Sequence, residues 1–292
     1  MTAATDAWER RGTRLPLAGH RVFVVDIDPV GEVEDEPLLV IHGFPTSSFD
    51  FHLVVDRLAA HRRVVLLDLV GFGLSDKPDV AYTVDLQADT VVALTDHLGL
   101  DRLSLLTHDF GDTVGGELLA RHLEGRWPVA IDRRVLTNGS IYIGMAHLSD
   151  GQLLLLDLPD AQLPEDVAFT VDTLAAGLAV TFSSASSVDD EELGGHAQLV
   201  LRSGGQRLLP RTIRYIEERR RREDRFTGAI ESHPSPLSVV WGADDPIAVV
   251  AMTDRLVEAR PGTPVEILEG VGHFPMFEAP DRFLDAVVRA LG

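Results

Sequence analysis

The sequence predicts an α/β fold with a mostly parallel central sheet, helices on both faces and an inserted helical cap. Two observations carry this prediction. Short apolar runs rich in valine and leucine alternate with helix-length segments, which is the order of βαβ units. This alternation stops between residues 141 and 232 and then resumes. We therefore expect a core formed by residues 1–140 and 233–292, with a helical cap over residues 141–232.

The first part of the core is predicted to open with a hairpin and to continue in alternating units. Apolar and polar residues alternate loosely around a glycine turn at Gly19, which predicts two paired strands. The later strands are expected to be covered on both faces, because they are almost continuously apolar. The predicted strands are 14–19, 21–28, 37–41, 63–69, 103–106 and 134–137, and the predicted helices are 47–60, 84–98 and 112–123.

The segment 141–232 contains no apolar run that resembles a buried strand, and we therefore predict a helical cap there. Its helical patterns cover residues 164–182 and 208–226. The alternation then returns, with strands predicted at 236–241 and 264–268 and helices at 249–259 and 280–291.

The composition excludes several classes of protein. The chain has 292 residues and no cysteine, so disulfides and thiolate metal sites are excluded. A formal net charge of −20 disfavours nucleic acid as a partner through long-range repulsion. The basic run at 219–222 is flanked by acids at helical spacings, which predicts a solvated helix face.

No membrane partner is expected either. Apolar stretches such as 174–180 are far shorter than the roughly 18 to 20 residues that a transmembrane helix needs. The start of the chain lacks a basic segment followed by an apolar one, so we expect an unprocessed cytoplasmic protein. The sequence leaves open whether the protein forms a homo-oligomer.

The most informative residue is Asp109, which lies between an apolar strand and a helix. Its surroundings, Thr107-His108-Asp109-Phe110-Gly111, suit a sharp strand-to-helix turn that exposes the central side chain at the carboxyl edge of the sheet. A carboxylate at this position can displace a leaving group from a saturated carbon and form an alkyl ester. Epoxides and alkyl halides are therefore expected as substrates before ordinary esters. The simpler alternative is that Asp109 only caps the following helix.

Two backbone amides are predicted to form an oxyanion hole beside Asp109. A glycine turn follows the strand at 37–41 and allows the Phe44 N–H to point back at the site. The second donor would be the N–H of Phe110.

Two later loops supply an acid and a base. Asp245 follows a predicted strand and can orient a histidine, and it is preferred over Asp244 because it immediately precedes a proline. His273 lies 28 residues further on (273 − 245), in a loop fixed by two glycines and a proline. The order nucleophile, acid, base is that of the α/β-hydrolase arrangement.

These motifs resemble the α/β hydrolases of the epoxide hydrolase and haloalkane dehalogenase branch, over roughly residues 20 to 292. The matching segments are 42–45, 71–78, 108–111, 241–246 and 272–275. Segments 108–112, 117–119 and 136–139 are still more similar to the mesoderm-specific transcript proteins of animals and their bacterial relatives. The resemblance implies an α/β-hydrolase fold, a triad of Asp109, Asp245 and His273, and a hydrolase that needs no metal or organic cofactor.

Epoxide hydrolases of this branch use cap tyrosines to donate a proton to the opening ring oxygen. The resemblance assigns this role to Tyr215, which lies 30 residues before Asp245 (245 − 215). The alternative is that Tyr215 only packs in the core. A second cap tyrosine has no obvious counterpart, so Tyr142, His147 or His196 would have to substitute for it.

Two further residues bear on the choice of function. The resembling dehalogenases generally have tryptophan after the nucleophile, whereas Phe110 offers no side-chain donor to a departing halide. We therefore predict an epoxide hydrolase acting on a small hydrophobic substrate, with a haloalkane dehalogenase as the alternative. Asp112 stands where a small residue is usual, and an extra carboxylate can raise a neighbouring pKa. Asp112 therefore favours a second alternative, a catalytically quiet ligand-binding protein of the same fold.

Overall fold

A single sheet of eight strands lies at the centre of the computed structural model, which describes residues 2–32, 35–167, 169–184, 186 and 188–292. The strands are β1 (Thr13–Leu17), β2 (His20–Ile27), β3 (Leu38–Ile41), β4 (Val64–Leu67), β5 (Arg102–His108), β6 (Ala130–Thr137), β7 (Leu237–Gly242) and β8 (Val265–Leu268). Their order is β1-β2-β4-β3-β5-β6-β7-β8. Only the pairs β1/β2 and β2/β4 are antiparallel among the described strands, so the predicted mostly parallel sheet is confirmed.

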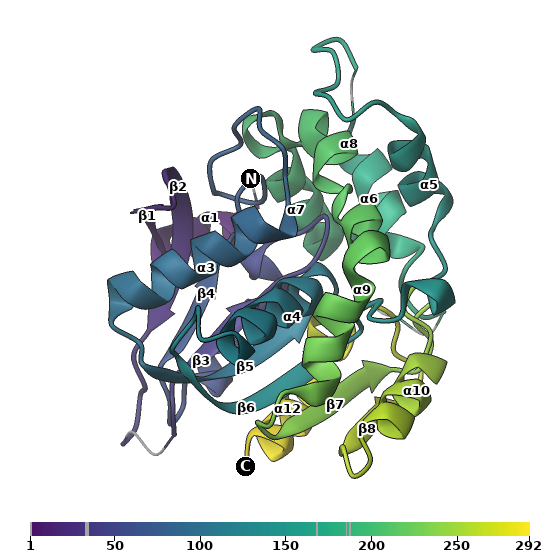
Figure 1. Cartoon of the computed structure of the whole chain (residues 1–292). Coiled ribbons are helices and arrows are strands. Elements are labelled where there is room, and N and C mark those ends of the chain that lie inside the picture. Colours follow the sequence, from purple (N-terminus) through teal and green to yellow (C-terminus); the bar gives the residue numbers. More distant parts are fainter. Residues whose placement is uncertain (1, 33–34, 168, 185, 187) are drawn as a thin grey trace.

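Helices cover both faces of this sheet (Figure 1). One face carries α3 (Val84–Leu98), α4 (Phe110–Leu123), α9 (Tyr215–Ser232) and α10 (Ala251–Ala259). The other carries α1 (Ala3–Arg11), the 3-10 helix η1 (Ser48–Phe51), α2 (Val55–Leu58), α11 (Pro275–Glu278) and α12 (Pro280–Leu291). The predicted helices over 84–98 and 280–291 are confirmed.

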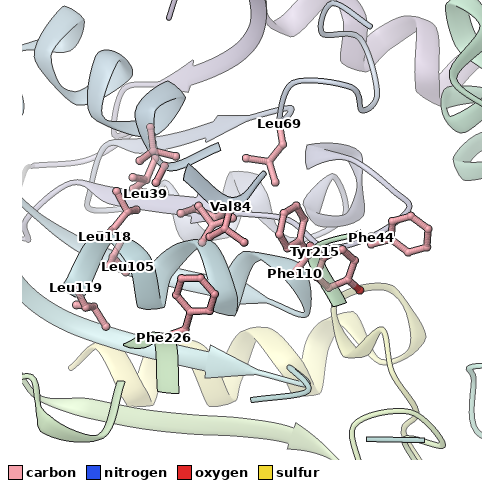
Figure 2. Packing of buried hydrophobic residues seen from close by; sticks show 14 of the residues in the cluster. Leu39, Phe44, Leu69, Val84, Leu105, Phe110, Leu118, Leu119, Tyr215 and Phe226 are labelled. Atoms are coloured by element: carbon pink, nitrogen blue, oxygen red, sulfur yellow. The ribbon is translucent and has the colours of Figure 1, made fainter. Parts of the chain in front are cut away.

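The continuously apolar strands supply both cores. Leu39 and Ile41 of β3 point to one core, and Leu38 and Val40, which alternate with them, point to the other, because successive side chains of a strand point to opposite faces. Burying each such side chain contributes roughly 1.5–3 kcal/mol. Figure 2 shows the first core, in which helices α4 and α9 pack over β3 and β5.

The parallel strands bring separate loops to one edge of the sheet. The carboxyl ends of neighbouring parallel strands share that edge, where ligands bind in open α/β sheets. The loops after β3, β5, β7 and β8 carry Phe44, Asp109, Asp245 and His273 in that order.

A helical segment lies between β6 and β7, as predicted. Its elements are η2 (Ile143–Met145), α5 (Asp150–Asp157), α6 (Val171–Ala179), α7 (Asp190–Leu201), η3 (Arg202–Leu208) and α8 (Leu209–Thr212), followed by α9. In Figure 1, α5, α6 and α8 lie at the upper right, α7 lies nearer the centre beside α1, and α9 leads from this helical segment back along the core. The division of the chain at residues 141 and 232 stays a prediction.

Three helix predictions were wrong in extent. The segment 47–60 forms η1 and the short α2 instead of one helix, because Asp68 Oδ1 accepts hydrogen bonds from both the N–H and the hydroxyl of Ser48 and fixes the first turn to the core. In the segment 164–182 the helix begins only at Val171, because Thr170 caps it. Residue 168, within that prediction, lies outside the described residues. The pattern at 208–226 is divided between α8 and α9.

Helices α1, α5 and α7 were not predicted, although each has a local start signal. Ser149 and Gln152 form a capping box at α5, and the Asp189 side chain caps α7. Thr2 caps α1 in the same way. Across the described ranges, every helix is too short or too polar to cross a membrane.

Candidate active site

The turn at Asp109 is sharp and strained. Asp109 lies between β5 and α4 with φ 49° and ψ −109°. Residues other than glycine rarely adopt such a positive φ. The turn requires close packing around it. A Cβ at Gly43 would lie 2.7 Å from Asp109 Cβ, and one at Gly111 would lie 2.2 Å from the Ile41 carbonyl oxygen. The strain of about 1–3 kcal/mol that such a backbone costs is typical of functional sites.

One oxygen of Asp109 already lies in the predicted oxyanion hole. The Phe44 N–H donates to Asp109 Oδ2 at 2.9 Å. Phe110 begins α4, so its N–H is among the first-turn amides that have no partner inside the helix. Asp109 makes no side-chain capping bond to α4, which argues against a purely capping role.

Asp245 is the acid that contacts His273. Its Oδ2 lies 2.7 Å from His273 Nδ1, and its Oδ1 accepts hydrogen bonds from two backbone N–H groups of the following turn. Asp244 is exposed. The Asn138 side chain, after β6, donates to the same Asp245 Oδ2 at 2.7 Å. These hydrogen bonds fix the orientation of the Asp245 carboxylate against His273.

His273 carries a positive charge at neutral pH in the resting protein. Burial opposes that charge, but the Coulombic attraction and hydrogen bond of Asp245, with further attraction from Asp109 and Glu278, raise the pKa of His273 to about 9. Asp109 is therefore close enough to His273 for its charge to matter. Glu278 also accepts hydrogen bonds from the Gly272 and Phe274 N–H groups at 3.0 Å and so holds the loop that carries His273.

Tyr215 lies beside the same carboxylate. Its ring centroid is 4.2 Å from that of Phe110 and 5.8 Å from that of Phe44. Figure 2 shows the three rings together at one end of the apolar cluster, with the tyrosine hydroxyl directed away from Phe226. Burial, together with the negative charge of Asp109, raises the pKa of Tyr215 well above its ordinary value, so its hydroxyl is protonated at neutral pH.

The three candidates for a second cap donor are engaged elsewhere or exposed. Tyr142 donates its hydroxyl to Glu231 Oε1 at 2.7 Å. The His196 ring lies between Asp50 and Glu192. His147 is exposed.

The prediction of a solvated helix face at 219–222 is wrong for Arg219. Arg220 and Arg221 are exposed, but Arg219 is only 2% exposed because it lies on the side of α9 that packs against α4. Its Nε donates to Thr113 Oγ1 at 2.7 Å, and its Nη2 donates to the Asp109 carbonyl oxygen at 3.4 Å. A buried cation therefore lies directly behind Asp109.

The surroundings of Asp112 favour its neutral form. Burial, with the nearby charge of Asp109, raises its pKa well above the ordinary value, although the Thr107 hydroxyl donates to its Oδ1. The raised pKa of Asp112 weakens the negative charge that this extra carboxyl group would add beside Asp109.

The family model named Alpha/beta hydrolase family matches residues 38–286, a range that contains all of these residues. The chain belongs to the alpha/beta hydrolase family. Its predicted membership is thus confirmed, and the eight-stranded sheet with its helical insertion is the fold of that family.

Individual relatives of this alpha/beta hydrolase match over nearly the whole chain. The putative hydrolase LipZ of Mycobacterium tuberculosis is 36% identical, over 97% of this chain and 96% of its own length. The mesoderm-specific transcript homolog protein of Bos taurus is 32% identical, over 98% of this chain and 87% of its own length, which confirms the predicted similarity. An alpha/beta hydrolase fold protein from Burkholderia ambifaria has a crystal structure with a TM-score of 0.75 at 24% identity, over 95% of this chain and 97% of that one.

Three polar residues of this alpha/beta hydrolase site escaped the sequence reasoning. Arg219, Asn138 and Glu278 each contact the triad loops from another element. Asn138 had a local signal in the sequence, since it directly follows a buried strand. In the structure it has a positive φ of 45°, which asparagine tolerates. The positions of Arg219 and Glu278 depend on how α9 and α11 pack, which local pattern does not give.

Proposed function

We propose that this alpha/beta hydrolase opens a small hydrophobic epoxide through a covalent ester on Asp109 and then hydrolyses that ester to a diol. The observation that carries the proposal is the 2.9 Å hydrogen bond from the Phe44 N–H to Asp109 Oδ2. It leaves Oδ1 as the attacking oxygen. The ester carbonyl oxygen is then already in the oxyanion hole when water attacks.

In the first step, Asp109 Oδ1 attacks an epoxide carbon and the bond from that carbon to the ring oxygen breaks. The opening ring becomes an alkoxide, a far stronger base than a phenolate. Tyr215, whose hydroxyl is protonated at neutral pH, donates its proton to this oxygen. The product is a hydroxyalkyl ester of Asp109.

In the second step, water attacks the ester carbon of Asp109 while His273 removes a proton from it. The Phe44 and Phe110 N–H groups stabilise the oxyanion, which collapses to free carboxylate and diol. The proton that His273 gives to solvent once the ester has formed restores the neutral hydroxyl of Tyr215. The proton that His273 takes from water restores its own resting charge. The sum is epoxide plus water giving diol, with the protein unchanged.

The charge of Asp109 supports a change in the protonation of His273 between the two steps. In the resting site the negative carboxylate is one of the groups that raise the pKa of His273. Esterification removes that charge, so the pKa of His273 falls when the ester forms. The imidazolium then gives its proton to solvent, and the neutral imidazole accepts one from the attacking water.

The surroundings of Asp109 support an uncharged, apolar substrate. Phe44, Phe72, Phe110 and Tyr215 form one connected aromatic group there, with ring centroids 4.2 to 6.4 Å apart. Apolar walls with a few directed polar groups are typical of small-molecule sites. An ordinary ester is a poorer candidate, because attack by Asp109 on its carbonyl would give an anhydride. Residence in the cytoplasm stays a prediction.

The test is the intact mass of the His273→Ala protein after incubation with a panel of hydrophobic epoxides and bromoalkanes. Without the base, hydrolysis of the ester is slow and the covalent adduct accumulates. An added mass equal to a whole epoxide supports the proposal. An added alkyl group with loss of bromide, and no epoxide adduct, would assign dehalogenation instead.

The control is the double variant Asp109→Ala with His273→Ala. It should form no adduct, and peptide mapping of the His273→Ala adduct should locate the modification on Asp109. Modification at another residue, or an intact Asp109 after exposure to the whole panel, contradicts the proposal.

A further inference from the structure

A second cluster of titratable side chains lies away from Asp109, where the cap meets the core. Glu192 and His196 are one turn apart on α7 and so project from the same face of that helix. His52 and Asp50 come from η1 and its C-terminal end. His196 is fully buried, while the side chains of His52 and Glu192 are 13% and 18% exposed.

Both imidazole rings are held in fixed orientations. His52 stacks on Phe49 with ring centroids 4.0 Å apart, and His196 stacks on Phe277 at 4.4 Å. His52 Nδ1 lies 2.9 Å from the Phe49 carbonyl oxygen. That oxygen accepts a hydrogen bond from the Nδ1–H, which leaves Nε2 of His52 with its lone pair directed toward Glu192.

His196 has the matching arrangement. Its Nδ1 lies 3.1 Å from Asp50 Oδ1, and its Nε2 lies 2.9 Å from Glu192 Oε1. Asp50 is itself held by the Thr46 hydroxyl, which donates to Oδ2 at 2.6 Å. A histidine that binds a metal through one ring nitrogen almost always gives the other N–H to a carboxylate or a backbone carbonyl. His52 meets that condition through the Phe49 carbonyl oxygen, and His196 Nδ1 faces the Asp50 carboxylate at ion-pair distance.

The two carboxylates need a positive partner. Within the described part of the chain, no lysine or arginine pairs with Asp50 or Glu192. The cluster therefore requires either protons on its histidines or a bound cation. Two imidazoles and one carboxylate are ligands that Zn²⁺ prefers.

The distances between the ligand atoms fit such an ion. One atom each of His52, Glu192 and His196 all lie within 4.8 Å of one another. His52 Nε2 lies 3.4 Å from Glu192 Oε2. Ligands at about 2.0–2.1 Å from a tetrahedral zinc are about 3.4 Å apart.

We propose that His52, Glu192 and His196 bind a zinc ion, with Asp50 orienting His196. This departs from the expectation that the protein needs no metal, but it gives the ion no part in the chemistry at Asp109. The ion would tie α7 of the cap to η1 of the core. It would also support the loop of His273 indirectly, because Phe277 stacks on Phe274 with ring centroids 4.9 Å apart.

Protons compete with zinc for this cluster. A histidine must be neutral to bind a metal, so zinc binding releases the protons that the histidines carry, and the affinity rises with pH.

The test uses the full-length protein, treated with EDTA and titrated with zinc chloride by calorimetry. We expect one zinc per chain, a melting temperature that rises with zinc, and proton release measured by repeating the titration in buffers of different ionisation enthalpy. His52→Ala and Glu192→Gln should each weaken binding at least about tenfold. Both substitutions are at partly exposed positions, and each variant must still melt cooperatively.

Two control variants separate this site from other histidines. His97→Ala, at an exposed position, and His273→Ala, at the active site, should bind zinc as the unchanged protein does. Absence of zinc binding by the EDTA-treated protein would overturn the proposal and leave an ion-pair cluster. Zinc binding that survives both His52→Ala and Glu192→Gln, or that is lost in His273→Ala, would overturn it as well.

Discussion

Asp245 Oδ2 lies 2.7 Å from Nδ1 of His273, and both side chains are buried. We expect Asp245→Asn to reduce kcat about 10³–10⁴-fold, because the amide neither stabilises a charged imidazole nor fixes the tautomer that removes a proton from water. Steady-state kinetics on the epoxide found by adduct mass would measure this. The matched control is the exposed neighbour, Asp244→Asn, which should keep nearly full activity. An equal loss in both variants contradicts the assignment.

Stability is expected to fall at alkaline pH. In the folded chain, burial opposes a charge on His273, but Asp245, Asp109 and Glu278 raise its pKa to about 9. Since a histidine in the unfolded chain titrates near 6.5, this stabilisation is complete below about pH 6.5 and is lost as the pH rises through about 9. Urea unfolding between pH 6 and 10 would measure the decline. His273→Ala should make it shallower, and an unchanged slope would contradict the contribution of His273.

Tyr215→Phe should slow ring opening without affecting ester hydrolysis. Loss of a positioned general acid typically costs about 10²–10⁴-fold. Rapid-quench mass measurements would separate formation of the ester from its decay. Tyr142→Phe is the control, because the Tyr142 hydroxyl already donates to Glu231. If Tyr215→Phe forms the ester at the normal rate, Tyr215 only packs in the core.

Arg219→Met should lower turnover about 10–100-fold, since a hydrogen bond from a charged group is worth about 1.5–3 kcal/mol. The substitution removes the guanidinium that donates to the Asp109 carbonyl oxygen and to the Thr113 hydroxyl. The expected signature is a lower kcat with little change in KM, because Arg219 lies behind Asp109. Arg220→Met, at the exposed neighbouring position, should have no effect, and equal effects in the two variants would contradict a role for Arg219.

Gly111→Ala should destabilise the fold by about 1–3 kcal/mol, because its Cβ would lie 2.2 Å from the Ile41 carbonyl oxygen and force the strand and helix apart. Gly228→Ala is the matched control within a helix. Its Cβ would meet nothing within 4 Å, so the substitution should stabilise by about 0.4–1 kcal/mol. Chemical denaturation of both variants would measure the difference, and a neutral Gly111→Ala would show that the turn can relax.

The local pattern of apolar residues and capping residues predicted most helices and strands of the core. The helices over 84–98 and 280–291 match the structure, because one apolar face and a cap or proline determine where each begins and ends. Local pattern failed at 47–60, where hydrogen bonds from Ser48 to Asp68 replace the regular helix. It also missed α5 and α7, whose capping residues were present but whose apolar faces are weak.

The sequence by itself determined the order of the strands' loops, and therefore that Asp109, Asp245 and His273 meet at one edge of a parallel sheet. That follows because the carboxyl ends of parallel strands coincide. Only the tertiary structure decided the burial of Arg219 behind Asp109 and the meeting of His52 with Glu192, which are 140 residues apart (192 − 52). Such contacts depend on how helices pack against the sheet, and helix packing is set by the shapes of whole surfaces, which no local pattern encodes.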